Sequence, residues 1–347
     1  QLNSNTTSRL VVTLSPATAT AGASNTVTIE ARDGNDVLLS GVSGTLIFTP
    51  APGTGTFTPS SVALTNGVAS FPVVFQTAGN QTVNATYTGL ATINPTAWTT
   101  VVVAGAATQF SISPASSLLT APANQTFTLT AQDAFGNTDL TYNRVVDLTR
   151  TGAAATLPAT VTTVNGVATF NGVFNASGNV QITASGADPA NLPNGTITGT
   201  ANVAVSAGPA TQLDVDISAG PYAVGTVATV TVTALDSQGN VASTLDGTNL
   251  TINGSPALGY TINPASPTFI NGVATYTITF TAAGFYTFTN IATGPITTAI
   301  GPMAVAAAPP PPSPTENLPT PTSICAMAAR TCRPSTAWAA ASPAART

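Results

Sequence analysis

Residues 66–71 read Asn66-Gly67-Val68-Ala69-Ser70-Phe71, and the pattern returns as Asn165-Gly166-Val167-Ala168-Thr169-Phe170 and as Asn271-Gly272-Val273-Ala274-Thr275-Tyr276. The spacings are 99 and 106 residues, which is about the length of a β-sandwich domain, so the chain is predicted to be a tandem array. Asparagine and glycine both accept the positive φ of a two-residue type I′ turn, so each copy predicts a β-hairpin. The motif is therefore a determinant of the fold and not a reactive site.

Two further signatures keep the same order around each copy. Upstream, strand-like runs end in Ala31-Arg32-Asp33, Ala131-Gln132-Asp133 and Ala234-Leu235-Asp236. Downstream stand Thr77-Ala78-Gly79-Asn80, Asn175-Ala176-Ser177-Gly178 and Ala282-Ala283-Gly284-Phe285. The runs between them alternate with period two, and the predicted core-facing sets are Phe127, Leu129 and Ala131; Val230, Val232 and Ala234; and Ala274, Tyr276, Ile278 and Phe280. The alternation predicts an all-β fold.

These motifs resemble the bacterial Ig-like domains that occur in tandem in invasin- and intimin-type adhesins and surface stalks. The segments Asp133-Ala134-Phe135-Gly136-Asn137 and Asp236-Ser237-Gln238-Gly239-Asn240 fit the family's strand end and Gly-Asn turn. In the first copy Asp33-Gly34-Asn35 is two residues shorter, so a different turn is expected there. The resemblance covers roughly residues 9–306, and it implies three immunoglobulin-like β-sandwiches and an extracellular or cell-surface location.

The junctions are expected where small residues separate two sandwiches, at Ala104-Gly105-Ala106 and Ala207-Gly208-Pro209. Links this short predict an elongated rod. The predicted domains are residues 1–104, which include an extended N-terminal segment, then 105–207, 208–307 and a proline-rich extended tail at 308–347. A polyproline run such as Pro309–Pro312 is suited to act as a spacer.

The composition excludes several classes of function. Charged residues make up 5% of the chain, the net charge is −5, and all seven basic residues are arginines. Such scattered arginines cannot form the basic stripe that nucleic-acid binding needs. No apolar stretch is long enough for a membrane span. Without lysine or histidine the usual catalytic bases are absent, so we expect no enzyme and no cofactor. The two cysteines, Cys325 and Cys332, lie in the tail, so the domains are expected to fold without disulfides.

Acidic residues offer two candidate roles. Asp214 and Asp216 share one face of a predicted strand and could offer oxygens to Ca²⁺, but a solvated strand face explains them better, and no metal site is predicted. Asp33, Asp133 and Asp236 each precede a turn, where a carboxylate typically accepts local backbone hydrogen bonds.

Glycan attachment and glycan binding are both weakly indicated. Chance alone would produce about six Asn-x-Ser/Thr sequons at this composition, so the eight present say little. The candidate glycan-bearing residues are Asn80, Asn84, Asn124, Asn175, Asn194, Asn249 and Asn253. Sugar-binding modules usually stack sugars on exposed aromatic rings, and the predicted domains contain one tryptophan, Trp98.

Two functional interpretations stay open. The first is an extracellular structural protein: a cell-surface stalk, or a subunit of a pilus-like fibre, with adhesion as a further role. Self-association would then use exposed sheet edges, with residues 1–9 or the C-terminal tail donating a strand. The second is a carbohydrate-binding or spacer module of a larger secreted enzyme.

Overall fold

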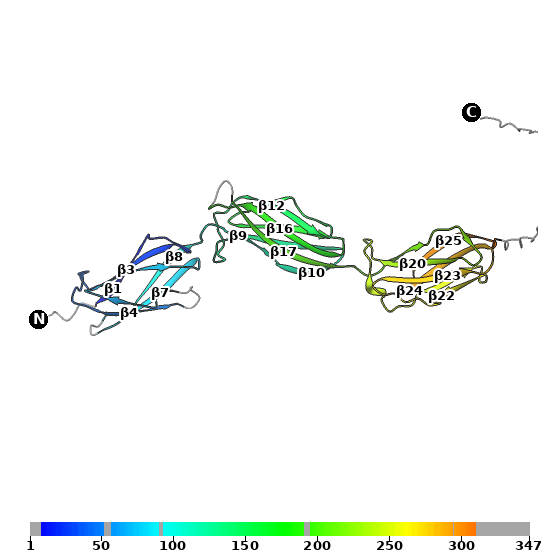
Figure 1. Cartoon of the computed structure of the whole chain (residues 1–347). Coiled ribbons are helices and arrows are strands. Elements are labelled where there is room, and N and C mark those ends of the chain that lie inside the picture. Colours follow the sequence, from blue (N-terminus) through cyan, green and yellow to red (C-terminus); the bar gives the residue numbers. More distant parts are fainter. Residues whose placement is uncertain (1–7, 52–56, 90–92, 191–194, 294, 310–347) are drawn as a thin grey trace, which may run out of the picture. The chain divides into compact units, whose positions relative to one another are not determined.

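The computed structural model describes residues 8–51, 57–89, 93–190, 195–293 and 295–309 (Figure 1). The chain divides into two units, Gln1–Ala307 and Ala308–Thr347. In the described part, strands are interrupted by a single helical element, the 3-10 turn η1 (Ser243–Leu245). Of the predicted proline-rich tail, all but residues 308 and 309 lies outside the described residues, as does most of the N-terminal segment that could donate a strand.

The first sandwich contains two sheets, with the strand orders β1-β3-β6 and β2-β8-β7-β4-β5. The strands are β1 (Arg9–Ser15), β2 (Ala19–Thr20), β3 (Ser24–Arg32), β4 (Gly44–Pro50), β5 (Ser61–Leu64), β6 (Val68–Val74), β7 (Gly79–Thr88) and β8 (Thr96–Val103). After β1 the chain crosses to the other sheet, where β2 pairs parallel with β8. The other strand pairs of this sandwich are antiparallel.

The second sandwich repeats this plan with the orders β13-β15-β11-β9 and β10-β17-β16-β12-β14. Its strands are β9 (Gln109–Ser113), β10 (Ser116–Thr120), β11 (Ala123–Gln132), β12 (Val145–Gly152), β13 (Ala155–Thr156), β14 (Thr160–Thr162), β15 (Val167–Phe174), β16 (Gly178–Ala187) and β17 (Thr196–Ser206). The parallel pair at the sheet edge is again present, here between β10 and β17.

The third sandwich repeats the plan of the second with one strand fewer. Its sheets have the orders β18-β20-β23-β22 and β19-β25-β24-β21. Its strands are β18 (Gln212–Ile217), β19 (Tyr222–Ala223), β20 (Val227–Leu235), β21 (Thr251–Ser255), β22 (Tyr260–Asn263), β23 (Val273–Phe280), β24 (Gly284–Thr293) and β25 (Ile296–Ala306). Here β22 pairs with β23 as β13 pairs with β15. The pairing of β5 with β4 and of β14 with β12 is reduced in this sandwich to an isolated bridge between Asn249 and Thr268. The strand orders are those of Ig-like sandwiches, so the predicted all-β, tandem Ig-like fold is confirmed.

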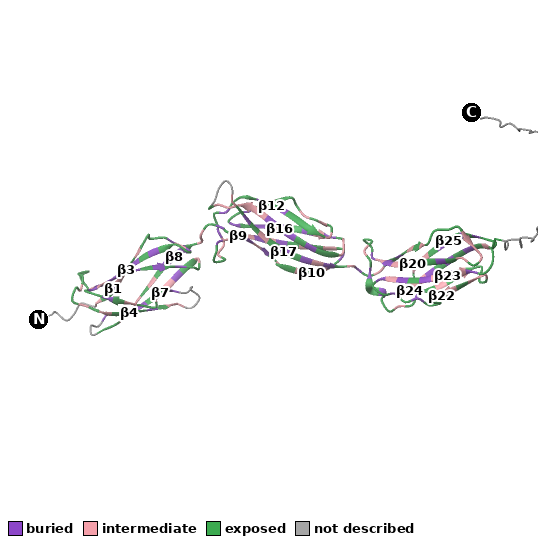
Figure 2. Cartoon of the chain, in the orientation of Figure 1, coloured by how far each residue is buried: buried purple, intermediate pink, exposed green. Residues whose placement is uncertain are grey.

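Each sandwich has its own hydrophobic core (Figure 2). The three clusters of buried residues extend from Leu10 to Val102, from Ala107 to Val205, and from Leu213 to Val305. The predicted core-facing residues of β11, β20 and β23 are all buried, while threonines such as Thr229 and Thr275 on the other faces are exposed. Period-two alternation therefore predicted the buried faces correctly.

The repeated Asn-Gly hairpins are confirmed. Asn165 and Gly166 have φ of 50° and 76°, and the other two copies have the same left-handed pair. The carbonyl of Gly166 accepts a hydrogen bond of 2.8 Å from the N–H of Ala131, and Gly67 and Gly272 bind Ala31 and Ala234 in the same way. The hairpin and the Ala-x-Asp signature recur together because they are hydrogen-bonded to each other.

Candidate functional site

Each Ala-x-Asp signature leads into a five-residue turn capped by its own carboxylate, which we call the Asp turn (33–37, 133–137 and 236–240). Asp133 Oδ1 accepts the N–H groups of Phe135 and Asn137, both at 2.9 Å. Asp236 Oδ1 binds two N–H groups at 2.8 and 2.9 Å, and Asp33 Oδ1 binds two at 2.9 Å. The predicted local capping role of all three aspartates is confirmed.

The expectation of a shorter first turn is wrong. All three turns have the same length, and their fourth residue is left-handed: Asp36 at φ 66°, Gly136 at 83° and Gly239 at 82°. Aspartate is one of the few side chains that tolerates this backbone conformation, so Asp36 replaces the glycine. The fifth position is then Val37 in the first copy, where the other copies have Asn137 and Asn240.

In the second and third Asp turns the other carboxylate oxygen binds the interdomain link. Asp133 Oδ2 accepts the N–H of Gly105 at 2.9 Å and the side-chain amide of Asn137 at 2.8 Å. Asp236 Oδ2 accepts the N–H of Gly208 at 2.8 Å and the side-chain amide of Asn240 at 2.9 Å. Each carboxylate therefore has four donors, although the two residues are only 2% and 1% exposed.

This donor set outweighs the effect of burial on the two carboxylates. Burial alone would raise the pKa of Asp133 and Asp236, because it disfavours the charged form. The asparagine amides and the backbone N–H groups instead hold both pKa values below the ordinary value of 3.8. The joints are therefore built around ionised carboxylates.

The asparagines of the second and third Asp turns also bind the preceding sandwich. Asn137 Nδ2 donates to the carbonyl of Gln76 at 2.7 Å, and Asn137 Oδ1 accepts the N–H of Ala78 at 2.9 Å. Both partners lie in the turn between β6 and β7. This two-point contact, which satisfies a backbone donor and a backbone acceptor with one amide, is named the clasp.

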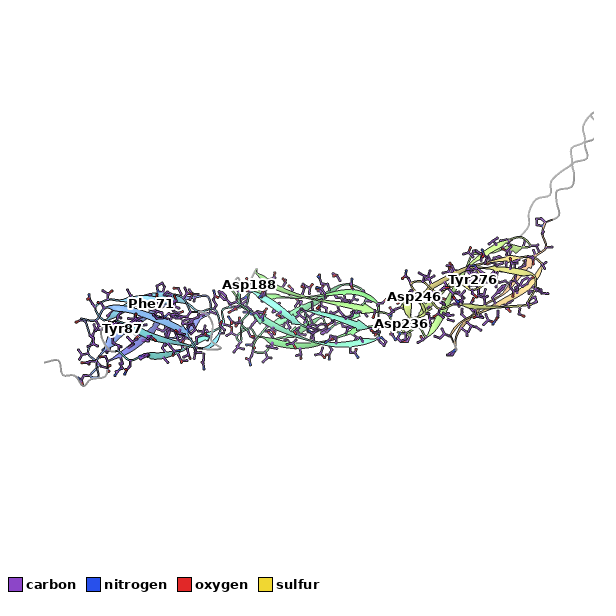
Figure 3. The ribbon with its side chains drawn as sticks, turned by 90° about the horizontal axis from the view of Figure 1, so that it is seen from below. Phe71, Tyr87, Asp188, Asp236, Asp246 and Tyr276 are labelled. Carbon is purple, nitrogen blue, oxygen red and sulfur yellow. The ribbon has the colours of Figure 1, made fainter. Side chains whose placement is uncertain are left out.

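The second joint repeats the clasp. Asn240 Nδ2 donates to the carbonyl of Asn175 at 2.7 Å, and Asn240 Oδ1 accepts the N–H of Ser177 at 2.8 Å. These partners lie between β15 and β16, the place that corresponds to the turn between β6 and β7. Figure 3 labels Asp236 of the same Asp turn at one end of the third sandwich. Residues 76–79 and 175–178 are therefore two equivalent receiving turns.

The glycines of the links lie close to other backbone, with no room for a Cβ at Gly208 and a tight fit for one at Gly105. An ideal Cβ on Gly208 would stand 2.5 Å from the carbonyl oxygen of Ala121, and one on Gly105 would stand 3.2 Å from that of Ala21. In the first joint the ring of Phe135 also covers Gly22, where a Cβ would lie 2.6 Å from the ring. Each link is thus held between the sandwich that it leaves and the Asp turn that it enters.

The remaining acidic candidates do not assemble into a site. Asp214 and Asp216 are both exposed on β18, as expected for a solvated strand face. Within the described ranges no three His, Cys, Asp or Glu residues cluster as metal ligands would. No helix of the described residues is long and apolar enough to cross a membrane.

The aromatic and sequon residues are also placed by the structure. Trp98 is half-buried and packs edge-on against Phe57 and Phe75, with ring centroids 5.5 and 6.2 Å apart. It therefore belongs to the first core. Asn194 lies outside the described residues, and the six other candidate glycan-bearing residues are exposed: Asn80, Asn84, Asn124, Asn175, Asn249 and Asn253. Whether they carry glycans stays a prediction.

Sequence reasoning assigned the aspartates a local role and missed the clasp. The sequence predicts Asn137 and Asn240 only as parts of a Gly-Asn turn, and Gly105 and Gly208 only as short links between sandwiches. One signal was present in the sequence: the asparagine four residues after the aspartate occurs in the second and third copies, whereas the first copy has Val37. In both of these copies the asparagine binds the preceding sandwich.

Comparison with known proteins finds no matching family model and no matching curated protein. Among solved structures, the Escherichia coli adhesin FdeC is 20% identical, with a TM-score of 0.40 over 87% of this chain and 96% of that one. Invasin, a bacterial integrin-binding protein, is 18% identical with a TM-score of 0.38, and domains 4–9 of the surface layer protein SbsC are 18% identical with 0.24. Each covers 86% of this chain, which spans 60% of the invasin structure and 47% of the SbsC structure.

Proposed function

We propose that the chain is an extracellular structural protein, a cell-surface stalk or fibre subunit whose clasped joints hold successive sandwiches in a fixed relation. The observation that supports it most is the repetition of the joint. Both junctions use an aspartate, an asparagine and a link glycine at equivalent positions. The corresponding donor–acceptor distances in the two junctions agree within about 0.1 Å. A flexible tether between independent domains would need none of these contacts.

The proposed domain boundaries are 1–104, 105–207, 208–307 and 308–347. They place Gly105 and Gly208 at the start of a domain, next to the Asp turn that binds each of them. An extracellular or cell-surface location and glycans on the exposed sequons belong to the same proposal. Intact-mass measurement of the protein from its native source would detect such glycans directly.

The stiffness of the first joint can be tested by removing its clasp. In Asn137→Ala both contacts to the preceding sandwich are lost, which should cost about 1–2 kcal/mol of docking free energy. Spin labels on Thr86 and Thr149, both exposed, would report the distance between the first and second sandwiches in double electron–electron resonance. We expect a narrow distance distribution in the parent chain and a clearly broader one in Asn137→Ala, with Cys325 and Cys332 replaced by serine in both.

Asn124→Ala is the matched control, since Asn124 is an exposed asparagine of the same sandwich that takes no part in the clasp. Its distance distribution should equal that of the parent chain. An Asn137→Ala distribution as narrow as the parent's, or a parent distribution already broad, would contradict the proposed function.

A further inference from the structure

Within the described residues two halves of the joint take no part in the two joints described above. Two of the three Asp turns, those of the second and third sandwiches, are used in the internal joints. Two of the three receiving turns, residues 76–79 and 175–178, are used as well. The Asp turn of the first sandwich and the third receiving turn, residues 281–284, have no counterpart in the chain's internal joints.

The third receiving turn differs from the other two in the apolar residues that surround it. The glycine of the first two receiving turns is followed by Asn80 and Asn179, whereas Gly284 is followed by Phe285, which is 73% exposed. Leu258, 83% exposed, lies in the adjoining loop, because the carbonyl of Gly259 accepts the N–H groups of Thr281 and Ala282 at 2.8 and 3.2 Å. Beside Phe285 an open groove of about 1060 Å³ is lined largely by apolar side chains, among them Ile217, Pro221, Tyr222, Ile300 and Met303.

The Asp turn of the first sandwich is also more apolar than its two counterparts. Val37 stands where Asn137 and Asn240 form the clasps, and it is 60% exposed, next to Leu38 at 37%. Charged pairs flank this apolar tip, since Arg9 binds Asp36 and Arg32 binds Glu30. An apolar centre with a charged rim is the usual composition of a protein–protein contact surface.

We propose that the first sandwich of one copy docks, through Val37 and Leu38, on residues 281–285 and Leu258 of the third sandwich of another copy. The proposal rests on the structural function proposed above and names the contact through which copies would associate. It extends an interface that the chain already contains twice, with an apolar pairing in place of the asparagine clasp. Because the contact is heterologous, a copy that docks through one of these two surfaces leaves its other surface free, so association continues into a linear chain.

Two end-capping variants test this. Val37→Asp disrupts the docking surface of the first sandwich and leaves that of the third sandwich intact. Phe285→Asp disrupts the surface of the third sandwich and leaves that of the first intact. Both positions are exposed, so thermal unfolding of the sandwiches should stay at the parent value. The parent full-length chain, under reducing conditions, should form concentration-dependent oligomers in sedimentation velocity at concentrations up to roughly 0.5 mM, as a small contact implies. Each variant alone should be monomeric, with self-association weakened at least about tenfold.

An equimolar mixture of the two variants provides the sharpest result. The Phe285→Asp chain keeps an intact first-sandwich surface and the Val37→Asp chain keeps an intact third-sandwich surface. The two chains should therefore pair into dimers and form nothing larger. Leu118→Asp is the control, because Leu118 is 82% exposed on β10 of the second sandwich, and it should associate like the parent. A monomeric parent chain, single variants that associate like the parent, or a mixture that stays monomeric would each overturn the proposal. None of these outcomes would change the spin-label distances that test the joints, so the two proposals fail separately.

Discussion

Gly166→Ala is expected to lower the free energy of unfolding of the second sandwich by about 3 kcal/mol or more. Gly166 has a φ of 76°, a conformation that costs an L-residue about 1–2 kcal/mol. In addition, an ideal Cβ would stand 2.4 Å from the carbonyl oxygen of Asp139. That oxygen cannot move away easily, since the N–H of Asp139 donates to Ala131 and its carboxylate holds the N–H of Ala107 at 2.9 Å.

Gly136→Ala separates the two causes. Gly136 has a similar φ of 83°, but a Cβ there would meet no atom within 4 Å. It should therefore cost only the conformational part, about 1–2 kcal/mol. Calorimetry of the full-length chain, with hydrogen exchange to assign the transition to the second sandwich, should show a fall in Tm of roughly 10–20 °C for Gly166→Ala. Equal shifts in the two variants would mean that the close approach to Asp139 does not limit the hairpin.

The same hairpin shows which part of the fold can be predicted from sequence. The turn type depends on the φ preferences of two adjacent residues, and the buried faces depend on a strict period of two, so both are local properties. The clasp is not local, because Asn137 and its two backbone partners are 59 and 61 residues apart. Nothing in the residues around Gln76 and Ala78 identifies them as partners, since only their backbone atoms take part.

The error in the first Asp turn has a related cause. Gly34 and Asn35 were matched to later Gly-Asn pairs by residue identity, although the backbone places the left-handed residue at Asp36. Counting from the capping aspartate gives the correct register, because its carboxylate binds the N–H of the fifth residue in all three turns. The same count shows that Val37 replaces the clasp asparagine, which is the observation behind the proposed contact between copies.

Asp236→Asn is expected to disrupt the second joint and to destabilise the third sandwich by about 2–4 kcal/mol. The substitution conserves shape, and its amide oxygen can still accept the N–H groups of Gln238 and Asn240. Its NH₂ group, however, would face two donors, the N–H of Gly208 and the side-chain amide of Asn240, which now bind Oδ2 at 2.8 and 2.9 Å. At 1% exposure, water cannot replace the lost acceptor, so those donors stay unsatisfied.

The charge that the substitution removes also makes the stability of the joint depend on pH. Hydrogen bonds outweigh burial and hold the pKa of Asp236 below 3.8 in the folded chain. The carboxylate therefore binds a proton less tightly in the folded chain than in the unfolded chain. The resulting stabilisation is fully present above the unfolded pKa and is lost as the pH falls through the lower folded value. The parent chain should therefore keep its Tm between about pH 7 and 5 and lose stability below about pH 4.

Calorimetry of the full-length parent and Asp236→Asn chains from neutral to acid pH tests both parts of this prediction. At neutral pH the variant's third sandwich should unfold at a clearly lower temperature, and below about pH 4 the gap to the parent should shrink, because the parent is then losing the same charge. Asp33→Asn is the control: the hydrogen bonds described for Asp33 go to Oδ1 from Asn35 and Val37, which an asparagine oxygen can accept. If Asp33→Asn and Asp236→Asn were equally destabilising at neutral pH, the aspartates would act only as local caps and the charged joint would be wrong.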